Sequence, residues 1–359
     1  MKLLYTTTID VPSTRANRLQ IMSMAEAFNR LLPGNFLLGL RVKNQGFETD
    51  VPCMEMGDTH SLIFAWRYMR LAKEKGFTHL YCREEKLLFF MVFLDRVFFR
   101  TRVAFCYELH HLVHVRLWWH HYLLQRVARV ISITHAMKEV LRESGYPRDI
   151  LVAPDAVDVA LFDIPLGKDD ARRQLNLPME KWIVMYTGTI HEPWKGTDLL
   201  YEAAARFEDD YLFVLVGGKP HYVDYFRRFH PDRSNVVLVG HKPHHEIPSY
   251  LKAADVLVLP NSGKEEISRV STSPMKLFEY MASGRPIIAS DLPSLREILN
   301  EGNALLVPPD DPEALAEGIR TLAQDSARGE LLAREARKDC ERYTWRERAE
   351  RVLSFIQST

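Results

Sequence analysis

The sequence predicts an α/β protein with two doubly wound domains, and three observations support this. The chain has 359 residues, which is long enough for two separate hydrophobic cores. It opens with a strand-like run, a turn-like loop and an amphipathic helix, which is the order that starts a Rossmann-like sheet. In the second half, short apolar runs recur at intervals long enough to hold a helix. This alternation is typical of parallel sheets covered by helices.

The expected elements of the first half alternate between strands and helices. Apolar residues between 16 and 32 recur with the spacing of one helix face. The other assignments are strands at 2–6, 78–82, 103–106, 130–134 and 150–153 and helices at 62–75 and 135–144. The loop after the first strand lacks GxGxxG, so it carries no dinucleotide-binding fingerprint.

His110 lies in the stretch YELHH that follows the strand expected at 103–106, and it is the candidate site residue of the first half. Open α/β sheets bind ligands outside the carboxyl ends of their strands, although a lone histidine there is more often structural. His110, His111 and His114 have the spacing of metal ligands on a helix. No HExxH motif or convergent carboxylate accompanies them, so we expect no metal site.

The second half repeats the strand pattern after a linker expected at 164–170. The strands are assigned to 181–187, 212–216, 235–240, 254–260, 287–290 and 304–307. Gly188 ends the first of them and permits a close backbone approach, and Lys195 precedes a helix start. Lys195 is therefore either a pyrophosphate contact or a solvated charge. Three histidines after the third strand, His241, His244 and His245, are expected to be polar loop residues.

The stretch 271–297, STSPMKLFEYMASGRPIIASDLPSLRE, predicts a loop, a helix and a buried strand. Ser273 is expected as the N-cap and Pro274 in the first helical turn. Lys276 also falls in that turn, where the helix dipole disfavours a cation unless an anion lies beside it. Glu279 follows about one turn later, where its carboxylate would accept hydrogen bonds from a ribose. The alternative is an amphipathic helix on which both charges are solvated.

The string SPMKLFEYMASGRPIIASDLP resembles the donor-binding signature of the retaining, GT4-like branch of GT-B glycosyltransferases. The segments PSTRANRLQIMSMAEAF, ISITHAMKEVL and VAPDAVDVALF are also similar to this family, in its bacterial envelope-polysaccharide type. The resemblance implies two Rossmann-like domains that face an interdomain cleft. It predicts an acceptor-binding domain at 1–163, a nucleotide-sugar-binding domain at 164–340, and a helix at 341–359 that crosses back to the first domain.

The resemblance also implies roles for individual residues. His110, Lys195 and Glu279 are expected in catalysis. The donor is expected to contact Gly188, Thr189, Lys195, Gly218, His241, Lys242, Ser273, Pro274, Met275, Lys276 and Glu279. Ser13, Arg15 and Glu108 are expected to contact the acceptor. The donor would be a UDP- or GDP-linked sugar, with no separate cofactor and no metal, and the acceptor a saccharide or a lipid-linked saccharide in envelope polysaccharide or glycoconjugate biosynthesis.

Two positions depart from the family pattern. Thr189 stands where the family commonly has an arginine, so one phosphate cation is missing, and Lys276 or Arg269 would have to replace it. Ser271 stands where the family often has a glutamate that reaches the sugar. The missing glutamate leaves open a catalytically weak protein that acts as a binding partner. A sugar-nucleotide epimerase is a second alternative because it shares the GT-B arrangement, although the signature SPMKLFEYMASG favours a transferase.

Composition and charge limit the location and the partners. The chain is 47% hydrophobic and 26% charged, as soluble proteins are, and its N-terminus lacks a signal-peptide pattern, so we expect a cytoplasmic protein. The four cysteines form no CxxC pair, which predicts reduced thiols. Residues 1–160 hold 21 Lys and Arg against 16 Asp and Glu, an excess that suits phosphate, nucleic acid or an anionic membrane surface; of these partners we expect no nucleic acid.

Aromatic and cationic residues concentrate between Lys86 and Arg129. They belong either to core elements with solvated arginines or to a surface that lies in the membrane interface. In the second case the protein would sit peripherally at the inner face of the cytoplasmic membrane. The residues expected at the lipid are Trp118, Trp119, Arg96, Arg100, Arg102, Arg116 and Arg126.

Overall fold

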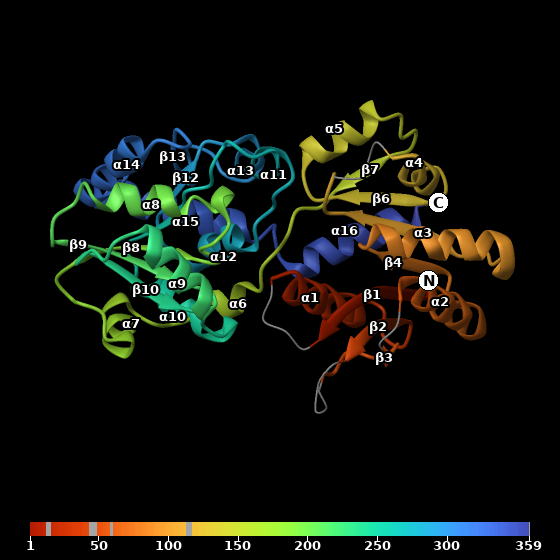
Figure 1. Ribbon diagram of the computed structural model, residues 1–359. Coiled ribbons are helices and arrows are strands. Elements are labelled where there is room, and N and C mark those ends of the chain that lie inside the picture. Colours follow the sequence, from red (N-terminus) through yellow and green to blue (C-terminus); the bar gives the residue numbers. More distant parts are fainter. Residues whose placement is uncertain (12–15, 43–48, 58–59, 113–116, 359) are drawn as a thin grey trace. The chain divides into compact units, whose positions relative to one another are not determined.

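The computed structural model describes residues 1–11, 16–42, 49–57, 60–112 and 117–358, and its contacts divide the chain into two compact units (Figure 1). Unit 1 comprises Met1–Asp155 together with Trp345–Thr359, and unit 2 comprises Ala156–Thr344. The first crossing between the units thus follows Asp155, before the boundary predicted at residue 163.

The segment predicted as a linker, 164–170, lies inside unit 2. Helix α7 (Lys168–Leu175) begins within it. The Lys168 ammonium lies 2.8 Å from the Asp255 carboxylate, and the buried Arg172 guanidinium donates to the same carboxylate at 2.5 Å. These ion pairs fix the segment to unit 2, and sequence spacing gave no sign of them.

Unit 1 is built on a seven-stranded parallel sheet with the order β3-β2-β1-β4-β5-β6-β7. Its strands are β1 (Leu3–Val11), β2 (Phe36–Val42), β3 (Cys53–Glu55), β4 (His79–Cys82), β5 (Ala104–Leu109), β6 (Arg129–Ser132) and β7 (Ile150–Val152). The order reverses at β1 and β4, as in a doubly wound sheet. Strand β5 runs on to Leu109, beyond the predicted end at residue 106, so His110 is the first residue after it.

Helices cover both faces of this sheet. One face carries α2 (Ser61–Lys75), α3 (Glu85–Leu94), α4 (Trp118–Leu124) and α5 (His135–Glu143), and the π-helical turn η1 (Asp95–Phe99) continues α3. The other face carries α1 (Ala16–Leu31), which packs against the C-terminal helix α16 (Trp345–Gln357). Phe28 of α1 contacts the rings of Tyr5 and Tyr81, which point to that face. The C-terminal helix therefore belongs to the core of unit 1.

Unit 2 is built on a six-stranded parallel sheet with the order β10-β9-β8-β11-β12-β13. Its strands are β8 (Trp182–Thr187), β9 (Tyr211–Val216), β10 (Val236–Gly240), β11 (Val256–Leu259), β12 (Ile287–Ser290) and β13 (Leu305–Val307). The residues of β11 and β12 are all buried, which explains why these strands read as continuous apolar runs. The order of the strands reverses between β8 and β11.

The helices of unit 2 lie on both sides of its sheet (Figure 1). They are α6 (Val159–Phe162), α7, α8 (Thr197–Ala204), α9 (Pro220–Phe229), α10 (Ile247–Ala253), α11 (Glu266–Val270), α12 (Met275–Ser283), α13 (Pro293–Arg296), α14 (Pro312–Gln324) and α15 (Ser326–Cys340), with short 3₁₀ turns η2 (Pro193–Lys195) and η3 (His244–Glu246). No helix of the described residues is both long and apolar enough to span a bilayer.

Helix α12 starts one residue later than predicted. Met275 is its first residue, and Pro274, with extended backbone angles, is the N-cap and makes no side-chain capping hydrogen bond. The N-cap role predicted for Ser273 is therefore wrong, because the extended Pro274 moves the start of the helix one position along the chain. Gly284 ends the helix in the left-handed conformation, with φ of 69°, as the sequence predicts.

Candidate functional site

The carboxyl edge of the unit 2 sheet brings several loops together at the point where the strand order reverses. Open α/β sheets bind their ligands at such a point. Gly196, after β8, lies against the carbonyl group of Pro260, after β11, and Gly217, after β9, lies against the carbonyl group of Gly188. A Cβ atom on Gly196 or Gly217 would collide with these carbonyl groups. Glycine thus allows three loops to pack backbone to backbone beside one site.

Lys276 projects from the first turn of α12 into this site. Its Nζ atom lies 3.8 Å from the centre of the Tyr186 ring, and a Cβ atom built on Gly188 would lie 2.5 Å from it. The ammonium is buried and has no hydrogen-bond partner among the described residues. Burial lowers the pKa of Lys276 well below its ordinary value, and the Lys195 ammonium lowers it further. The Lys276 ammonium therefore has room for a hydrogen bond to an anionic ligand.

Lys195 supplies a second cation at the end of η2. Its Nζ atom lies 3.4 Å from the centre of the Trp194 ring and 4.0 Å from the Glu192 carboxylate. Burial lowers the pKa of Lys195 to about 8, against the opposing charge of Glu192. The site therefore holds two buried ammonium groups whose charges Glu192 and Glu279 offset only in part, because burial still leaves both lysine pKa values lowered; this suits a ligand with more than one negative charge.

Helix α12 is fixed to β8 by Tyr280. The Tyr280 hydroxyl accepts a hydrogen bond from the Thr187 backbone N–H at 2.7 Å, and both residues are buried. The next residue toward the helix start, Glu279, is 7% exposed and bonds to His244 Nε2 at 2.9 Å. Burial alone would lower the pKa of His244, but the hydrogen bond to Glu279 and its charge raise it above the ordinary value. His244 is thus more than the polar loop residue that the sequence predicts.

The other predicted donor residues of unit 2 differ in how they are held. The Thr189 hydroxyl donates to the Glu192 carboxylate at 3.2 Å, and a Cβ atom on Gly218 would press on the Ile190 side chain. Lys242 lies 4.0 Å from the Glu246 carboxylate, and His241, next to it, is exposed. These contacts leave the predicted roles as predictions. Ser273, Pro274 and Met275 form the entry to α12 beside Lys276.

Arg269, considered as a replacement for the missing arginine, is otherwise engaged. Its guanidinium donates to the carbonyl groups of Gly263 at 2.5 Å and Lys264 at 3.0 Å. It therefore braces the loop before α11. Lys276 is the other candidate for this replacement, and its ammonium has no hydrogen-bond partner among the described residues.

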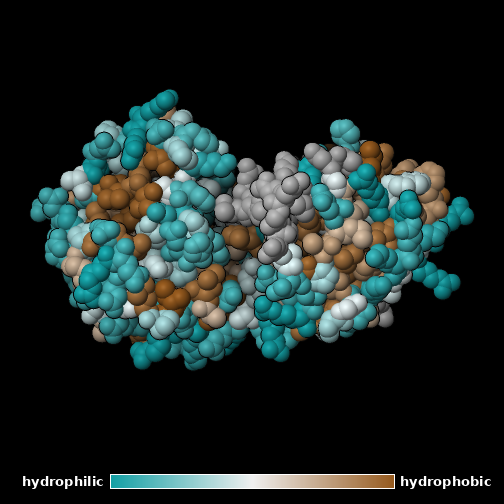
Figure 2. All heavy atoms as spheres, turned by 90° about the horizontal axis from the view of Figure 1, so that it is seen from below, coloured by the Kyte–Doolittle hydropathy of each residue, from teal (hydrophilic) through white to brown (hydrophobic). Residues whose placement is uncertain are grey.

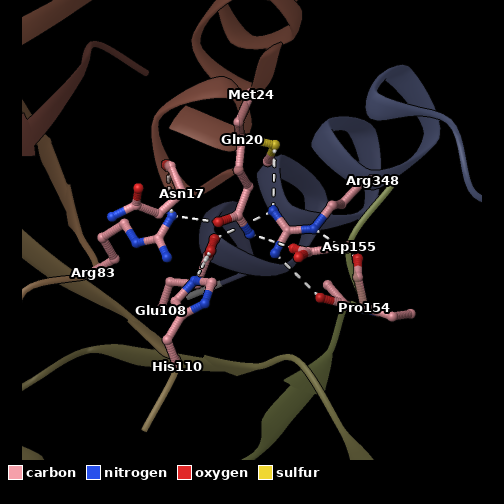
Figure 3. Close-up of polar contacts among 10 residues, drawn as sticks. Asn17, Gln20, Met24, Arg83, Glu108, His110, Pro154, Asp155 and Arg348 are labelled. Atoms are coloured by element: carbon pink, nitrogen blue, oxygen red, sulfur yellow. Dashed lines mark hydrogen bonds and ion pairs between the residues drawn. The ribbon is translucent and has the colours of Figure 1, made fainter. Parts of the chain in front are cut away.

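Unit 1 contains a buried polar network around His110 (Figure 3). His110 Nε2 bonds to one oxygen of Glu108, and the other oxygen accepts a hydrogen bond from Arg348 Nη1 at 3.2 Å. Arg348, on α16, also donates to the carbonyl groups of Pro154 at 2.8 Å and Ala153 at 3.1 Å. The C-terminal helix thereby holds both the strand end at Glu108 and the last residues of unit 1 before the chain leaves it.

A second branch of the network runs from Asp155 to α1. The Asp155 carboxylate accepts a hydrogen bond from Gln20, whose carbonyl oxygen accepts one from Arg83 (Figure 3). Burial raises the pKa of Asp155 to about 7, Arg348 opposes this, and the Glu108 charge adds to it. Two buried carboxyl groups thus feel the charge of one guanidinium, and Asp155 is the one that holds its proton more readily.

The protonation state of His110 follows from its surroundings. Burial and the Arg83 charge lower the pKa of His110 to about 4, although Glu108 opposes them. Burial would raise the pKa of Glu108, but the charges of Arg348 and His110 lower it to about 2. At neutral pH a neutral imidazole therefore faces a carboxylate, so Nε2 carries the proton and Nδ1 is left as an acceptor. Glu108, predicted to contact the acceptor, has both oxygens engaged within the protein.

Some residues of these groups were not found by sequence reasoning, and two predicted ones lie outside the described residues. Arg348, Asp155 and Gln20 gave no signal, because their partners lie far away in the chain. Ser13 and Arg15 fall in the segment 12–15, which is outside the described residues. Among the described residues, no cluster of three or more His, Cys, Asp or Glu side chains is arranged to hold a metal ion.

Comparison with known proteins gives the family. Residues 36–161 match the family model described as Glycosyltransferase Family 4, and residues 181–325 match the model described as Glycosyl transferases group 1. The phosphatidyl-myo-inositol mannosyltransferase of Mycolicibacterium smegmatis is 32% identical over 55% of this chain and 49% of its own length. A D-inositol 3-phosphate glycosyltransferase of Xylanimonas cellulosilytica is 28% identical over 65% of this chain and 57% of its own length. The chain thus spans about half the length of the curated relatives it matches.

Solved structures show the same fold. Sucrose-phosphate synthase from Thermosynechococcus elongatus superimposes with a TM-score of 0.81 at 20% identity, over 99% of this chain and 98% of that one. Anabaena Alr3699/HepE in complex with UDP-glucose superimposes with a TM-score of 0.79 at 20% identity over the whole of both chains. The two matched models together cover well over half of the sequence, and the chain belongs to the GT4-like glycosyltransferases of the GT-B fold.

Proposed function

We propose that the protein transfers a sugar from a UDP- or GDP-linked donor to a saccharide or lipid-linked saccharide, with retention of anomeric configuration and without a metal ion. The observation that carries this is the buried ammonium of Lys276, which has no partner among the described residues and lies beside Gly188 and Lys195 at the carboxyl edge of the unit 2 sheet. The UDP-glucose complex of a protein with the same fold supports a nucleotide-sugar as the donor.

The leaving group of this reaction is a nucleoside diphosphate, and the site suits its charge. The bond from the anomeric carbon to the phosphate oxygen breaks, the acceptor oxygen bonds to the same face, and its proton passes to the released diphosphate. Lys276, Lys195 and the free N–H groups at the start of α12 would stabilise the negative charge as it develops. Glu279, held by His244, would accept hydrogen bonds from the ribose hydroxyl groups.

His110 has a different part in this proposal. Because its Nε2 proton points to Glu108, its Nδ1 atom is an acceptor for a hydroxyl group of the transferred sugar or of the acceptor. Glu108 and Arg348 would act as positioning residues that fix the imidazole. The envelope-polysaccharide role and the location at the inner face of the cytoplasmic membrane also belong to the proposal.

Calorimetry with UDP and GDP tests the donor site. Glu279→Ala and Lys195→Ala are each expected to weaken binding of the preferred nucleotide by roughly 10- to 150-fold, because a hydrogen bond to a charged group contributes about 1.5–3 kcal/mol. Lys338→Ala, an exposed position on α15, is the matched control and should bind normally. Unchanged affinity in both site variants would remove the proposed site. A thermal-shift panel of nucleotide-sugars on the wild type then identifies the sugar.

The pH dependence of nucleotide binding follows from Lys195. Its pKa is about 8 in the free protein, and a bound diphosphate would raise it, so binding takes up protons near this pH. The affinity is expected to fall as the pH rises above 8, by up to about tenfold per unit for one proton. Calorimetry in Tris and in HEPES measures the proton uptake directly. Lys195→Arg should flatten the profile, and a steeper profile in that variant contradicts the assignment.

A further inference from the structure

An exposed apolar surface lies on the face of unit 1 that carries α2, α3 and α4. It is formed by large hydrophobic side chains of α2, α3, η1 and the start of α4, and we call it the aromatic ridge. Its members are Leu62, Ile63, Trp66, Phe93, Val97, Phe98, Leu117 and Trp118, all exposed. Figure 1 places α3 between α2 and α4, and Figure 2 shows apolar surface at the end of unit 1 where α2 and α3 lie.

The members of the ridge are neighbours in space. The Trp66 ring lies 5.6 Å from the Phe98 ring, which joins α2 to η1. Phe89 lies 6.4 Å from Trp118, which joins α3 to α4, and Phe93 follows Phe89 at the spacing of one helix turn. Trp118 is 76% exposed and Phe98 is 59% exposed. Monomeric proteins rarely leave large aromatic side chains this open in one place without a partner.

The backbone holds Phe98 outward at a cost in stability. The helix changes from α to π at Asp95, and Arg100 closes the turn in the left-handed conformation with φ of 49°, which is unfavourable for a residue with a Cβ atom. The Asp95 carboxylate secures this turn by accepting hydrogen bonds from the N–H and hydroxyl groups of Thr101, at 2.8 and 2.7 Å. The hydrogen bonds of Asp95 thus hold the end of η1, the segment that carries the exposed Phe98.

The charge around the ridge selects among the partners that an apolar surface could have. Residues 61–102 contain nine Lys and Arg against four Asp and Glu. Arg96, Arg100 and Arg102 surround η1, are exposed, and make no ion pair with a described residue. Exposed tryptophan and phenylalanine flanked by free arginine are what a protein uses to lie on an anionic lipid surface.

We infer that the aromatic ridge is a membrane-docking surface for anionic lipid, with Phe98 and Trp118 inserted at headgroup depth and Arg96, Arg100 and Arg102 contacting lipid phosphates. The sequence alone left this region divided between core and membrane. The structure shows that α3 has one face in the core and one face open to solvent. Leu87, Leu88 and Met91 are buried in the core, while Phe93 is exposed. Residues of α2 join the surface, although they lie outside the predicted segment, and Arg116 lies outside the described residues.

Flotation of the full chain with lipid vesicles tests the inference. The inference rests on the proposed function, because it specifies the surface that would hold the protein at the membrane. The wild type should float with phosphatidylglycerol vesicles at low salt, more weakly at high salt, and poorly with phosphatidylcholine vesicles. Phe98→Ser with Trp118→Ser should weaken binding by about tenfold or more. The matched control is Tyr225→Ser with Phe229→Ser on α9, where the side chains are 55% and 65% exposed, and it should bind as the wild type does.

Three results would overturn the inference. The first is that the wild type does not float with phosphatidylglycerol vesicles. The second is that the Phe98/Trp118 variant binds these vesicles as strongly as the wild type, and the third is that the α9 control loses as much binding as the Phe98/Trp118 variant. Sedimentation velocity adds a further check, because a dimer that dissociates in the Phe98/Trp118 variant would mean that a second copy covers the ridge instead. UDP calorimetry on the same variant should give wild-type affinity, so a failure of the membrane inference stays distinct from a failure of the donor site.

Discussion

Replacing Lys276 by Met is expected to stabilise the free protein and to weaken nucleotide binding. In the free protein the Lys276 ammonium is buried with no described partner and within reach of a second ammonium, so its charge costs stability. Methionine fills the same volume without that charge, and we expect about 1–3 kcal/mol of added unfolding free energy. Chemical denaturation of the nucleotide-free protein measures this gain.

The loss of binding has the same origin. A bound diphosphate would pair with the Lys276 ammonium, which has no hydrogen-bond partner among the described residues. Removing this ammonium should therefore cost about 2–5 kcal/mol of binding free energy. Lys338→Met, at a side chain that is 70% exposed, is the matched control and should change neither quantity by more than about 0.5 kcal/mol. A Lys276 variant that is less stable and binds normally would show that the lysine is structural. If Lys276 serves an anion site, its replacement raises the unfolding free energy and weakens nucleotide binding. If it is structural, the replacement lowers the unfolding free energy and leaves binding unchanged.

Replacing Arg348 by Met is expected to destabilise the protein by about 3–5 kcal/mol, because it leaves the Glu108 carboxylate buried without its cation. The carbonyl groups of Ala153 and Pro154 also lose their donors. The control is Arg351→Met on the same helix, where an exposed side chain donates to the Val152 carbonyl group; we expect less than about 1 kcal/mol. Equal effects of the two variants would contradict the network.

The pH dependence gives this prediction a signature that a packing defect lacks. In the wild type the pKa of Glu108 is lowered to about 2, so its stabilisation is complete above the unfolded value near 4.5 and is lost as the pH falls toward 2. Without Arg348, burial favours the neutral carboxyl group, so the deficit of the variant should be largest at neutral pH and shrink below pH 4.5. Denaturation curves at pH 3 and pH 7 distinguish this from a constant deficit.

The sequence predicted the fold class and the position of α12 because both depend on local pattern. Apolar runs at helix-length intervals specify buried parallel strands, and the buried β11 and β12 are examples. The predicted helix and its neighbours placed Lys276 and Glu279 correctly on α12, with an error of one residue at the N-cap. Helix ends depend on the backbone angles of single residues such as Pro274, and spacing does not fix these.

What the sequence could not give are contacts between residues far apart in the chain. Arg348 reaches Glu108 across 240 positions, and His244 reaches Glu279 across 35, so no periodicity or motif links them. The same holds for the aromatic ridge, where α2 contributes Trp66 from outside the aromatic segment. The sequence by itself indicated most strands of the two sheets and where a family signature lies, but it missed β2 and β3 and treated the start of α7 as a linker. Only the tertiary structure decided which charges are buried, which are paired and which face solvent, because burial and pairing are properties of the packed chain.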